Sequence, residues 1–269
     1  MTLTILTWNT LFAGRDGADG RRAQTQIKVI SAIKPDVFLM QEAKGFDAGG
    51  GALLHALESQ IGMRGFLAVA PRTGQNVAIF IREPLRPLSF EIDGANFHHA
   101  LATLKVALPG EDRPLTLISA HLCPNGPAVR RREAAYLAVQ AVPGSLALLT
   151  GDFNSASPHD PEPEGFGALP AHHRARYLAD DLKGVDRSVL AYLEAAGWVD
   201  IGHALDKATT PTVPTAAFTG TEFATMRCDY VLATAALAAG AKRYEVIRTP
   251  ETDTASDHYP VVVTFEVPA

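Results

Sequence analysis

The chain has 269 residues, of which 47% are hydrophobic and 20% charged, so its composition is that of an ordinary globular protein with ample material for a core. Its formal net charge of −5 gives no overall positive field for nucleic acid or anionic membranes, although a local patch or a bound cation can reverse the sign in a cleft. The two cysteines, Cys123 and Cys228, exclude a disulfide framework and form no CxxC metal motif.

The N-terminal part of the chain has the pattern of a strand, a helix and a second strand. Residues 3–8 are rich in branched and aromatic side chains and predict a strand that ends at Asn9. Isoleucines at helical spacing predict an amphipathic helix over 21–33, and residues 36–40 predict a strand that ends before Glu42. Two strands joined in this way are usually parallel neighbours. We therefore expect Asn9 and Glu42 at the edge where α/β sheets bind ligands.

The rest of the chain predicts further helices and strands. Helices are expected at 52–61, 128–141 and 187–196. Residues 66–70 and 77–81 predict a hairpin. Apolar runs bounded by turn residues predict the remaining strands, at 100–106, 115–120, 146–149, 229–233, 243–247 and 261–267. The sequence has no internal repeat and no break in composition, so we expect one domain over residues 1–269, with helices outside its sheets.

The stretch from Leu146 to Asn154 combines a short buried-strand pattern with polar groups. Its apolar residues end near a glycine, and a carboxylate and an amide follow two positions apart, at Asp152 and Asn154. In an extended segment, that spacing puts both side chains on one face, where both can reach a single reacting group. The alternative is an Asx turn, in which these side chains only bond nearby backbone.

Polar residues also lie at the ends of other predicted strands, and each has a structural alternative. An amide can end a strand, a glutamate can cap a helix, a histidine can belong to the core and an aspartate can shape a turn. Their shared position favours a functional site, because burying so many acids, amides and imidazoles without a cation and a substrate is costly. The candidate site residues are Asn9, Glu42, His121, Asp152, Asn154, Asp229, Asp257 and His258.

This set of residues suits metal-assisted hydrolysis of a phosphoester. Mg²⁺ prefers oxygen ligands and usually takes one or two carboxylates, with water and phosphate oxygens completing its shell. Glu42 and Asp257 are the candidate ligands. Such an ion polarises the phosphoryl oxygen, while a positioned base activates the attacking water. An imidazole beside a carboxylate can also stabilise charge that develops on the phosphate.

Short motifs along the chain resemble those of the endonuclease/exonuclease/phosphatase superfamily and follow its order. They are Thr7-Trp8-Asn9, Gln41-Glu42, Ser119-Ala120-His121-Leu122, Gly151-Asp152-Phe153-Asn154, Arg227-Cys228-Asp229-Tyr230 and Ser256-Asp257-His258-Tyr259-Pro260. Each motif is weak alone, but together they extend over nearly the whole chain. The resemblance implies a four-layer α/β sandwich, in which two mixed sheets lie face to face with helices outside and the site lies where the strand ends meet.

The resemblance implies roles for the acids and amides. Glu42 would bind the catalytic Mg²⁺ or Mn²⁺, helped by Asp257 and Asn9. Asp152 would align or deprotonate the nucleophilic water, and Asn154 would orient the phosphate.

The resemblance also implies roles for the histidines. His258 would contact the scissile phosphate, with Asp229 holding its far nitrogen. His121 stands where many members have a histidine and the exonuclease III-like repair enzymes have a tyrosine, which disfavours abasic-site repair. Members of the pancreatic deoxyribonuclease type pair this histidine with a glutamate. Here the nearest candidates, Gln75 and Asn76, are amides.

Two further features bear on the substrate. The polar connection from Ser155 to Lys183 leaves directly from Asn154 and is long enough to shape the pocket. Arg130–Arg132 fall at a helix start and point in three directions, which favours a solvated face. The alternative is that one of these arginines reaches substrate phosphate.

We therefore expect a Mg²⁺- or Mn²⁺-dependent phosphoesterase that favours a small or single-stranded phosphoester. The alternatives are an endonuclease or exonuclease on DNA or RNA, and a repurposed member that binds or transforms a non-phosphate ligand in the same pocket. No apolar run approaches a membrane span, and residues 1–6 lack the charged start and apolar centre of a signal peptide. We expect a cytoplasmic monomer.

Overall fold

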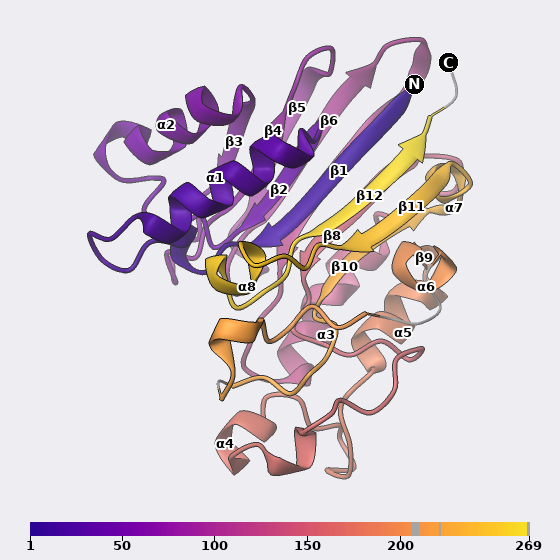
Figure 1. The fold of residues 1–269 in the computed structure, drawn as a ribbon. Helices are drawn as coiled ribbons and strands as arrows, with labels where there is room; N and C mark the ends of the chain where they lie inside the picture. Colours follow the sequence, from indigo (N-terminus) through magenta and orange to yellow (C-terminus); the bar gives the residue numbers. More distant parts are fainter. Residues whose placement is uncertain (206–209, 221, 268–269) are drawn as a thin grey trace.

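Two six-stranded sheets form the centre of the computed structural model (Figure 1), which describes residues 1–205, 210–220 and 222–267. The first sheet has the order β11 (Ala241–Val246), β12 (Val261–Glu266), β1 (Thr2–Asn9), β2 (Val37–Gln41), β4 (Val77–Ile81) and β3 (Arg64–Ala68). The second has the order β5 (Arg86–Asp93), β6 (Leu101–Leu108), β7 (Glu111–His121), β8 (Leu146–Asp152), β10 (Asp229–Thr234) and β9 (Trp198–Asp200).

Helices of very different lengths connect these strands. The α-helices are α1 (Arg21–Ile33), α2 (Ala52–Ile61), α3 (Pro127–Ala138), α4 (Ala171–Arg174), α5 (Ser188–Ala195), α6 (Ile201–Leu205), α7 (Ala235–Ala238) and α8 (Thr252–Ala255). Short 3-10 turns occur at η1 (Phe12–Gly14), η2 (Gly49–Gly51), η3 (Phe166–Ala168) and η4 (Ala216–Phe218). None of the described helices is both long and apolar enough to cross a membrane.

The predicted unit of strand, helix and strand at the N-terminus is confirmed. β1 and β2 pair in parallel, with Ile5 opposite Val37, and α1 crosses between them. Lys34 ends the helix in the left-handed region, with a φ of 51°, and its N–H bonds to the carbonyl oxygen of Ile30. This cap and the proline that follows it prevent the helix from continuing.

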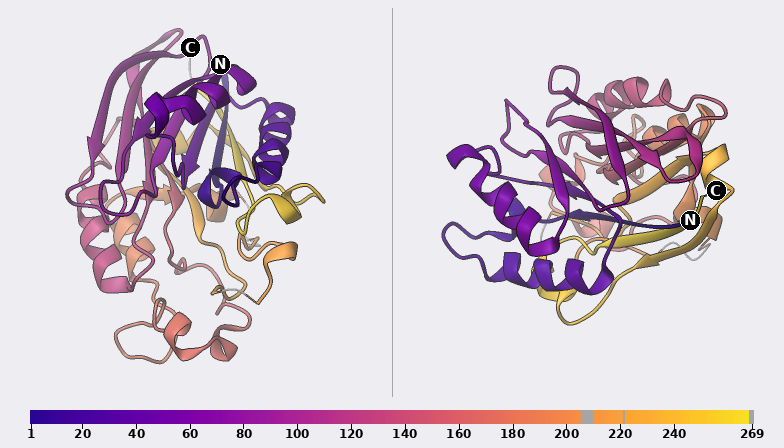
Figure 2. Two further views of the ribbon diagram at one scale, coloured as in Figure 1. Left: turned by 90° about the vertical axis from the view of Figure 1, so that its left-hand side faces the viewer. Right: turned by 90° about the horizontal axis from the view of Figure 1, so that it is seen from above.

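The two sheets face each other and enclose the central core. Leu39, Ile79, Leu104, Leu117 and Val263 are among its fully buried side chains. α1 and α2 pack on the outer face of the first sheet, and α3 and α5 pack on the outer face of the second (Figure 2). Because each sheet contains one parallel and several antiparallel pairs, the fold is the predicted four-layer α/β sandwich with two mixed sheets.

Several elements differ from the prediction, among them the edge strands β3 and β5. β3 and β4 pair antiparallel as the expected hairpin, although β3 begins at Arg64 rather than at residue 66. The sequence pattern does not predict β5, because Pro87 interrupts it and the pairing with β6 shifts register just after this residue. Leu88 and Ile92 of β5 are 60% and 50% exposed, as an edge strand allows, so they show no buried-strand pattern.

The long connection after β8 packs together with the segment before β10 around a small shared core. Phe166, Tyr177, Val185, Val213 and Met226 are buried together there. In Figure 1 this region, which carries α4, lies beyond the end of the sheets toward which β1 points. Its core holds the connection against the edge where the predicted site residues lie.

Candidate active site

Strand register brings predicted site residues of the second sheet into one row. β7 and β8 are parallel, and their pairing places His121 opposite Asp152. β10 pairs with the other side of β8 and places Asp229 opposite Asp152. From the first sheet, Asn9 ends β1 and His258 lies shortly before β12, so the ends of both sheets contribute to one site.

Asn9 connects the carboxylates of the two sheets. Its Nδ2 donates to Glu42 Oε1 at 3.3 Å and to Asp152 Oδ2 at 3.1 Å. Its Oδ1 accepts the N–H of Leu11 at 3.1 Å. The amide therefore bridges the proposed metal ligand and the proposed base.

The backbone beside Glu42 is held in unusual conformations. Leu11, Phe12 and Glu42 have φ values of 44°, 57° and 61°, in the left-handed region that costs energy for residues other than glycine. In this turn the N–H of Phe12 donates to Glu42 Oε2 at 3.0 Å. Backbone strain gathered around one carboxylate is typical of a functional site.

The Glu42 carboxyl lies in an environment that disfavours its charge. Burial raises its pKa to about 7, and the Asp257 carboxylate adds to this effect, while the N–H of Phe12 opposes it. Both carboxyl groups line the same pocket. A bound cation would offset the repulsion between them.

His258 is held between two carboxylates. Its Nδ1 lies 2.8 Å from Asp229 Oδ2, which confirms the predicted contact, and its Nε2 lies 3.6 Å from Asp152 Oδ2. Burial alone would lower the pKa of His258, but the charges of Asp229 and Asp152 outweigh burial and raise it well above its usual value. The two carboxylates therefore favour the positively charged form of the buried His258, whose Nε2 lies close to Asp152.

His121 has a different environment. Its Nε2 lies 3.4 Å from Asp152 Oδ2, and its ring stacks on His99 with 4.2 Å between ring centroids. Burial, with a contribution from the charge of His258, lowers the pKa of His121 to about 3, so the ring is neutral. In the described part of the chain, its buried Nδ1 has no hydrogen-bond partner.

The amides considered as partners of His121 are placed differently. Asn76 donates to the Ala43 carbonyl oxygen at 3.2 Å and to Asp47 Oδ1 at 2.8 Å. Gln75 lines the pocket beside His121. Within the described part of the chain, neither of these amides nor any carboxylate bonds His121 Nδ1.

Asp152 and Asn154 share the site through a turn rather than through an extended segment. Asn154 has a φ of 47°, and its N–H donates to Asp152 Oδ1 at 2.8 Å, as in an Asx turn. The prediction that a straight strand aligns both side chains is therefore wrong. The turn nevertheless leaves both residues in the same pocket.

The predicted site residues except Asp229 line a pocket of about 180 Å³, which we call the site pocket. Asp229 is linked to this pocket through its contact with His258. It also contains residues that the sequence patterns do not single out, namely Leu11, Phe12, His99, Pro124, Arg176, Glu222 and Phe223. Arg176 belongs to the long connection that is predicted to shape the pocket. The others lie in loops or, for Phe12, in the short turn η1, where no periodic pattern marks them. The pair His98-His99, shortly before β6, is a local sign of one of them.

The predicted solvated face of Arg130–Arg132 is wrong for Arg130. Its side chain is fully buried and donates to Ser155 Oγ at 2.9 Å, to the Cys123 carbonyl oxygen at 3.0 Å and to the Arg176 carbonyl oxygen at 2.9 Å. Arg131 and Arg132 are exposed, as expected. Arg130 therefore holds the backbone of a residue that lines the site pocket.

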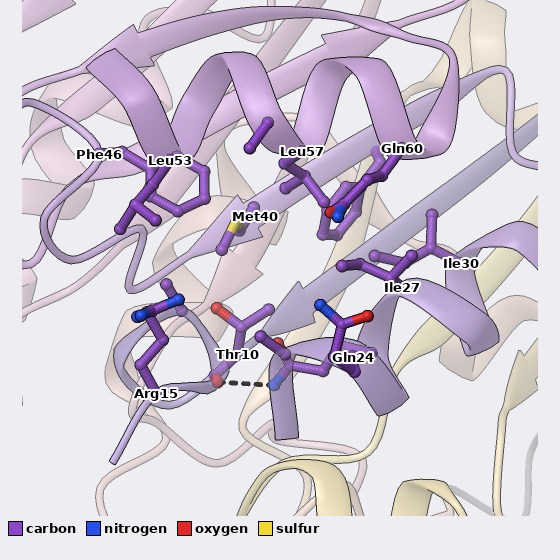
Figure 3. A pocket seen from close by; sticks show the side chains of 15 residues that line it. Thr10, Arg15, Gln24, Ile27, Ile30, Met40, Phe46, Leu53, Leu57 and Gln60 are labelled. Atoms are coloured by element: carbon purple, nitrogen blue, oxygen red, sulfur yellow. Dashed lines mark hydrogen bonds between the residues drawn. The ribbon is translucent and has the colours of Figure 1, made fainter. Parts of the chain in front are cut away.

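A second pocket, of about 120 Å³, lies between α1 and α2 (Figure 3). Side chains such as Ile27, Met40, Leu53 and Leu57 make it mainly apolar, with Arg15 among its polar members. It shares no residue with the site pocket and contains no carboxylate or imidazole. This second pocket therefore lacks the acids and imidazoles that line the site pocket.

The sequence from residue 6 to residue 258 matches the Endonuclease/Exonuclease/phosphatase family. The chain belongs to this family. The predicted resemblance is thereby confirmed over nearly the whole length of the protein. Among curated proteins, none matches the sequence significantly.

Solved structures share the fold of this endonuclease/exonuclease/phosphatase family member. An AP endonuclease from Archaeoglobus fulgidus is 21% identical, with a TM-score of 0.72 over 98% of this chain and 100% of that one. An endonuclease/exonuclease/phosphatase from Beutenbergia cavernae DSM 12333 is 18% identical, with a TM-score of 0.71 over 99% and 72% of the two chains. D. rerio TDP2, complexed with a single-strand DNA product, is 17% identical, with a TM-score of 0.67 over 99% of each chain.

Enzymes of the endonuclease/exonuclease/phosphatase family use divalent metal ions, and two groups of donors here could hold one. Asp152, Asp229 and His258 each bring a ligand atom within 4.8 Å of the others. Asp229 already holds Nδ1 of His258, however, and a cation bound between them would have to replace the proton on this nitrogen. Glu42 and Asp257 offer only oxygen ligands, and their two negative charges repel each other. The Glu42 group therefore fits a hard divalent cation better.

Proposed function

We propose that this protein is a divalent-metal-dependent phosphoesterase that hydrolyses a phosphodiester or phosphomonoester by in-line attack of water. The observation that carries the proposal is the convergence of Glu42, Asp257, Asp152 and the Asp229–His258 pair on one pocket. Family membership supports phosphoester chemistry in general. The side chains, rather than the fold, support the specific reaction.

Glu42 and Asp257 would hold one Mg²⁺ or Mn²⁺, with Asn9 as a further donor. When bound, the ion would polarise the phosphoryl oxygen and offset its charge. The protein prepares Glu42 for this role through the bonds from Phe12 N–H and from the Asn9 amide. These bonds hold the carboxylate in one orientation before any ligand arrives.

Asp152 would align the attacking water and accept its proton. Its Oδ1 accepts the N–H of Asn154 and its Oδ2 accepts the Asn9 amide, so the carboxylate is held in one orientation. Asn154 uses one amide hydrogen to bond the Leu122 carbonyl oxygen at 3.1 Å. Its second amide hydrogen is available to orient a phosphate oxygen.

His258 would stabilise the negative charge that develops on the phosphate. Asp229 holds its Nδ1, so the Nε2–H is the group that can donate to a phosphoryl oxygen. His121, which is neutral, would orient water or the leaving group rather than act as a carboxylate-supported acid.

Hydrolysis of chromogenic esters tests the proposal. We expect Mn²⁺-dependent release of nitrophenol from p-nitrophenyl phosphate or bis-p-nitrophenyl phosphate, and loss of most of this activity in EDTA and in Asp152→Asn. Asp112→Asn, an exposed acid outside the site pocket, serves as the matched control and should keep full activity. Equal rates in the wild type and in Asp152→Asn would refute the proposal.

A nuclease that acts on single-stranded nucleic acid is the second candidate, because one structural neighbour was solved with a single-strand DNA product. Recognition of duplex DNA is disfavoured by the ratio of 24 basic to 29 acidic residues. A duplex-binding protein loses affinity steeply with salt, with a log–log slope of about −0.9 per phosphate contact. Plasmid nicking at low enzyme concentration with a steep salt dependence would favour a duplex nuclease instead.

A further inference from the structure

Arg176 is the one lysine or arginine among the described residues that line the site pocket. Glu42, Asp152 and Asp257 line the same pocket, so the protein contributes mainly negative charge to it. A phosphoester is itself an anion. Beside His258, the guanidinium of Arg176 is therefore a group with which the chain itself can attract that anion, and it can bond two phosphate oxygens at once.

The position of Arg176 is set by the surrounding structure. Its Nε donates to the Pro124 carbonyl oxygen at 3.0 Å, and its own carbonyl oxygen accepts Nη2 of the buried Arg130 at 2.9 Å. Its guanidinium carbon lies 5.6 Å from the ring centroid of Tyr177. With only 14% of the side chain exposed, Arg176 has little freedom to leave the pocket.

The partner of Arg176 is less restricted. Nη1 of Arg176 forms an ion pair with Glu222 Oε2, and Nδ1 of His173 lies 3.9 Å from the same oxygen. The Glu222 side chain is 42% exposed and also lines the pocket. This carboxylate can therefore return to water at small cost, whereas the buried arginine cannot.

We propose that Arg176 forms a phosphate-binding subsite, which Glu222 closes until a phosphate group of the substrate displaces its carboxylate. The inference rests on the proposed function, because it concerns the same pocket. Carboxylate and phosphate oxygens pair with a guanidinium in the same way, so one anion can replace the other without leaving the cation bare.

Competition with the Glu222 carboxylate makes the affinity of the subsite depend on the charge of the ligand. Glu222 is tethered to the chain and carries one negative charge, so a singly charged diester must compete against a high local concentration of an equal charge. A terminal phosphate carries about −1.5 to −2 near neutral pH and interacts more strongly with the same cation. The subsite therefore favours substrates with a terminal phosphate over internal diesters.

Anion binding to the metal-free protein tests the subsite without requiring catalysis. Inorganic phosphate and dimethyl phosphate, which carries one charge, are titrated in EDTA at constant ionic strength, with the melting temperature as the readout. We expect the wild type to prefer phosphate. Glu222→Gln should bind both anions at least about threefold more tightly and lose part of this preference, because its competing charge is gone.

Changes of Arg176 give the opposite result. Arg176→Gln should weaken phosphate binding by about tenfold or more, and Arg176→Lys should recover part of the loss. The double variant, which carries both Arg176→Gln and Glu222→Gln, should bind phosphate as weakly as Arg176→Gln, because Glu222 acts only through this arginine. Glu91→Gln and Arg131→Gln are exposed controls of the same chemistry and should behave like the wild type.

Unchanged binding in Glu222→Gln, or a gain that persists in the double variant, would overturn the inference. If Asp152→Asn abolishes turnover but phosphate affinity is the same in Arg176→Gln and the wild type, the subsite is refuted and the proposed function stands. If phosphate binding depends on Arg176 but the protein hydrolyses no ester, the subsite stands and the proposed function is refuted. In the active enzyme, Arg176→Gln should raise KM for p-nitrophenyl phosphate more than it lowers kcat.

Discussion

Asp229 Oδ2 lies 2.8 Å from Nδ1 of His258, and this contact joins the two sheets. Asp229 is the first residue of β10 in the second sheet, whereas His258 lies shortly before β12 in the first. The indole of Trp8 donates to the His258 carbonyl oxygen at 2.8 Å, so the backbone is held as well as the ring. The pair therefore determines which nitrogen of His258 faces Asp152 and the pocket.

Asp229→Asn should separate turnover from metal binding. Asparagine can hold the ring, but it carries no charge to favour the imidazolium and can also hold the wrong tautomer. We expect kcat to fall by about 100-fold or more. Stabilisation by Mn²⁺ should stay close to that of the wild type, because Asp229 is not among the proposed donors. Initial rates and melting curves with Mn²⁺ test this, and near-normal turnover would show that the pair is not required.

Glu42→Gln should abolish stabilisation by Mn²⁺. Glutamine keeps an oxygen that can accept the Phe12 N–H, so the fold should survive, but it lacks the charge that a hard cation requires. The wild type should melt at a higher temperature as Mn²⁺ is added, and the variant should not. Glu91→Gln, an exposed change of the same kind, is the control. Equal stabilisation of variant and wild type by Mn²⁺ would remove Glu42 from the set of ligands.

The buried His99 should make the protein sensitive to acid. Burial, with contributions from His121 and His98, lowers the pKa of His99 from 6.5 to about 2. The unfolded chain therefore binds a proton below pH 6.5 that the folded protein does not bind, so stability falls as the pH decreases from that point. Between pH 6.5 and pH 5, His99 alone should remove up to about 2 kcal/mol of unfolding free energy.

The His99→Asn variant tests this loss. An asparagine nitrogen can replace Nδ1 beside Thr73 Oγ1, which lies 2.8 Å away, but it does not titrate. Urea unfolding at pH 7.5 and pH 5.0 should show a smaller decrease for His99→Asn than for the wild type, by up to about 2 kcal/mol. His172→Asn, at an exposed position, should match the wild type. Identical decreases in all three proteins would contradict the prediction.

The fold and the strand-end part of the site follow from local patterns. Apolar runs locate β1, β2 and β8, and residues at strand ends must meet wherever neighbouring strands share a register. This is why the sequence alone predicts that Asp152, Asp229 and His121 lie together, as the strand pairing confirms. The predicted single domain, cytoplasmic location and monomeric state stay predictions.

The remaining site residues do not follow from the sequence, because tertiary packing rather than periodicity places them. His99, Arg176 and Glu222 reach the pocket from connections whose path depends on distant contacts. Arg130 is predicted to be solvated because three arginines in sequence cannot all face one surface. One of the three directions nevertheless points inward, where backbone carbonyl oxygens accept hydrogen bonds from its guanidinium.

Arg130 and Arg131 should therefore differ sharply in their effect on stability, although they are adjacent in α3. Arg130→Ala removes a buried guanidinium and takes this donor away from Ser155 Oγ and from the carbonyl oxygens of Cys123 and Arg176. We expect a loss of about 3 kcal/mol in unfolding free energy, because buried polar groups that lose a charged partner keep their desolvation cost.

Arg131→Ala is the matched control. This side chain is exposed and bonds one carbonyl oxygen, that of Ser188, so its loss should change stability by no more than about 0.5 kcal/mol. Because Arg130 bonds the Arg176 backbone, Arg130→Ala should also weaken phosphate binding at temperatures where it remains folded. Urea unfolding of both variants decides the comparison. Similar stabilities for Arg130→Ala and Arg131→Ala would show that the buried guanidinium does not hold the long connection in place.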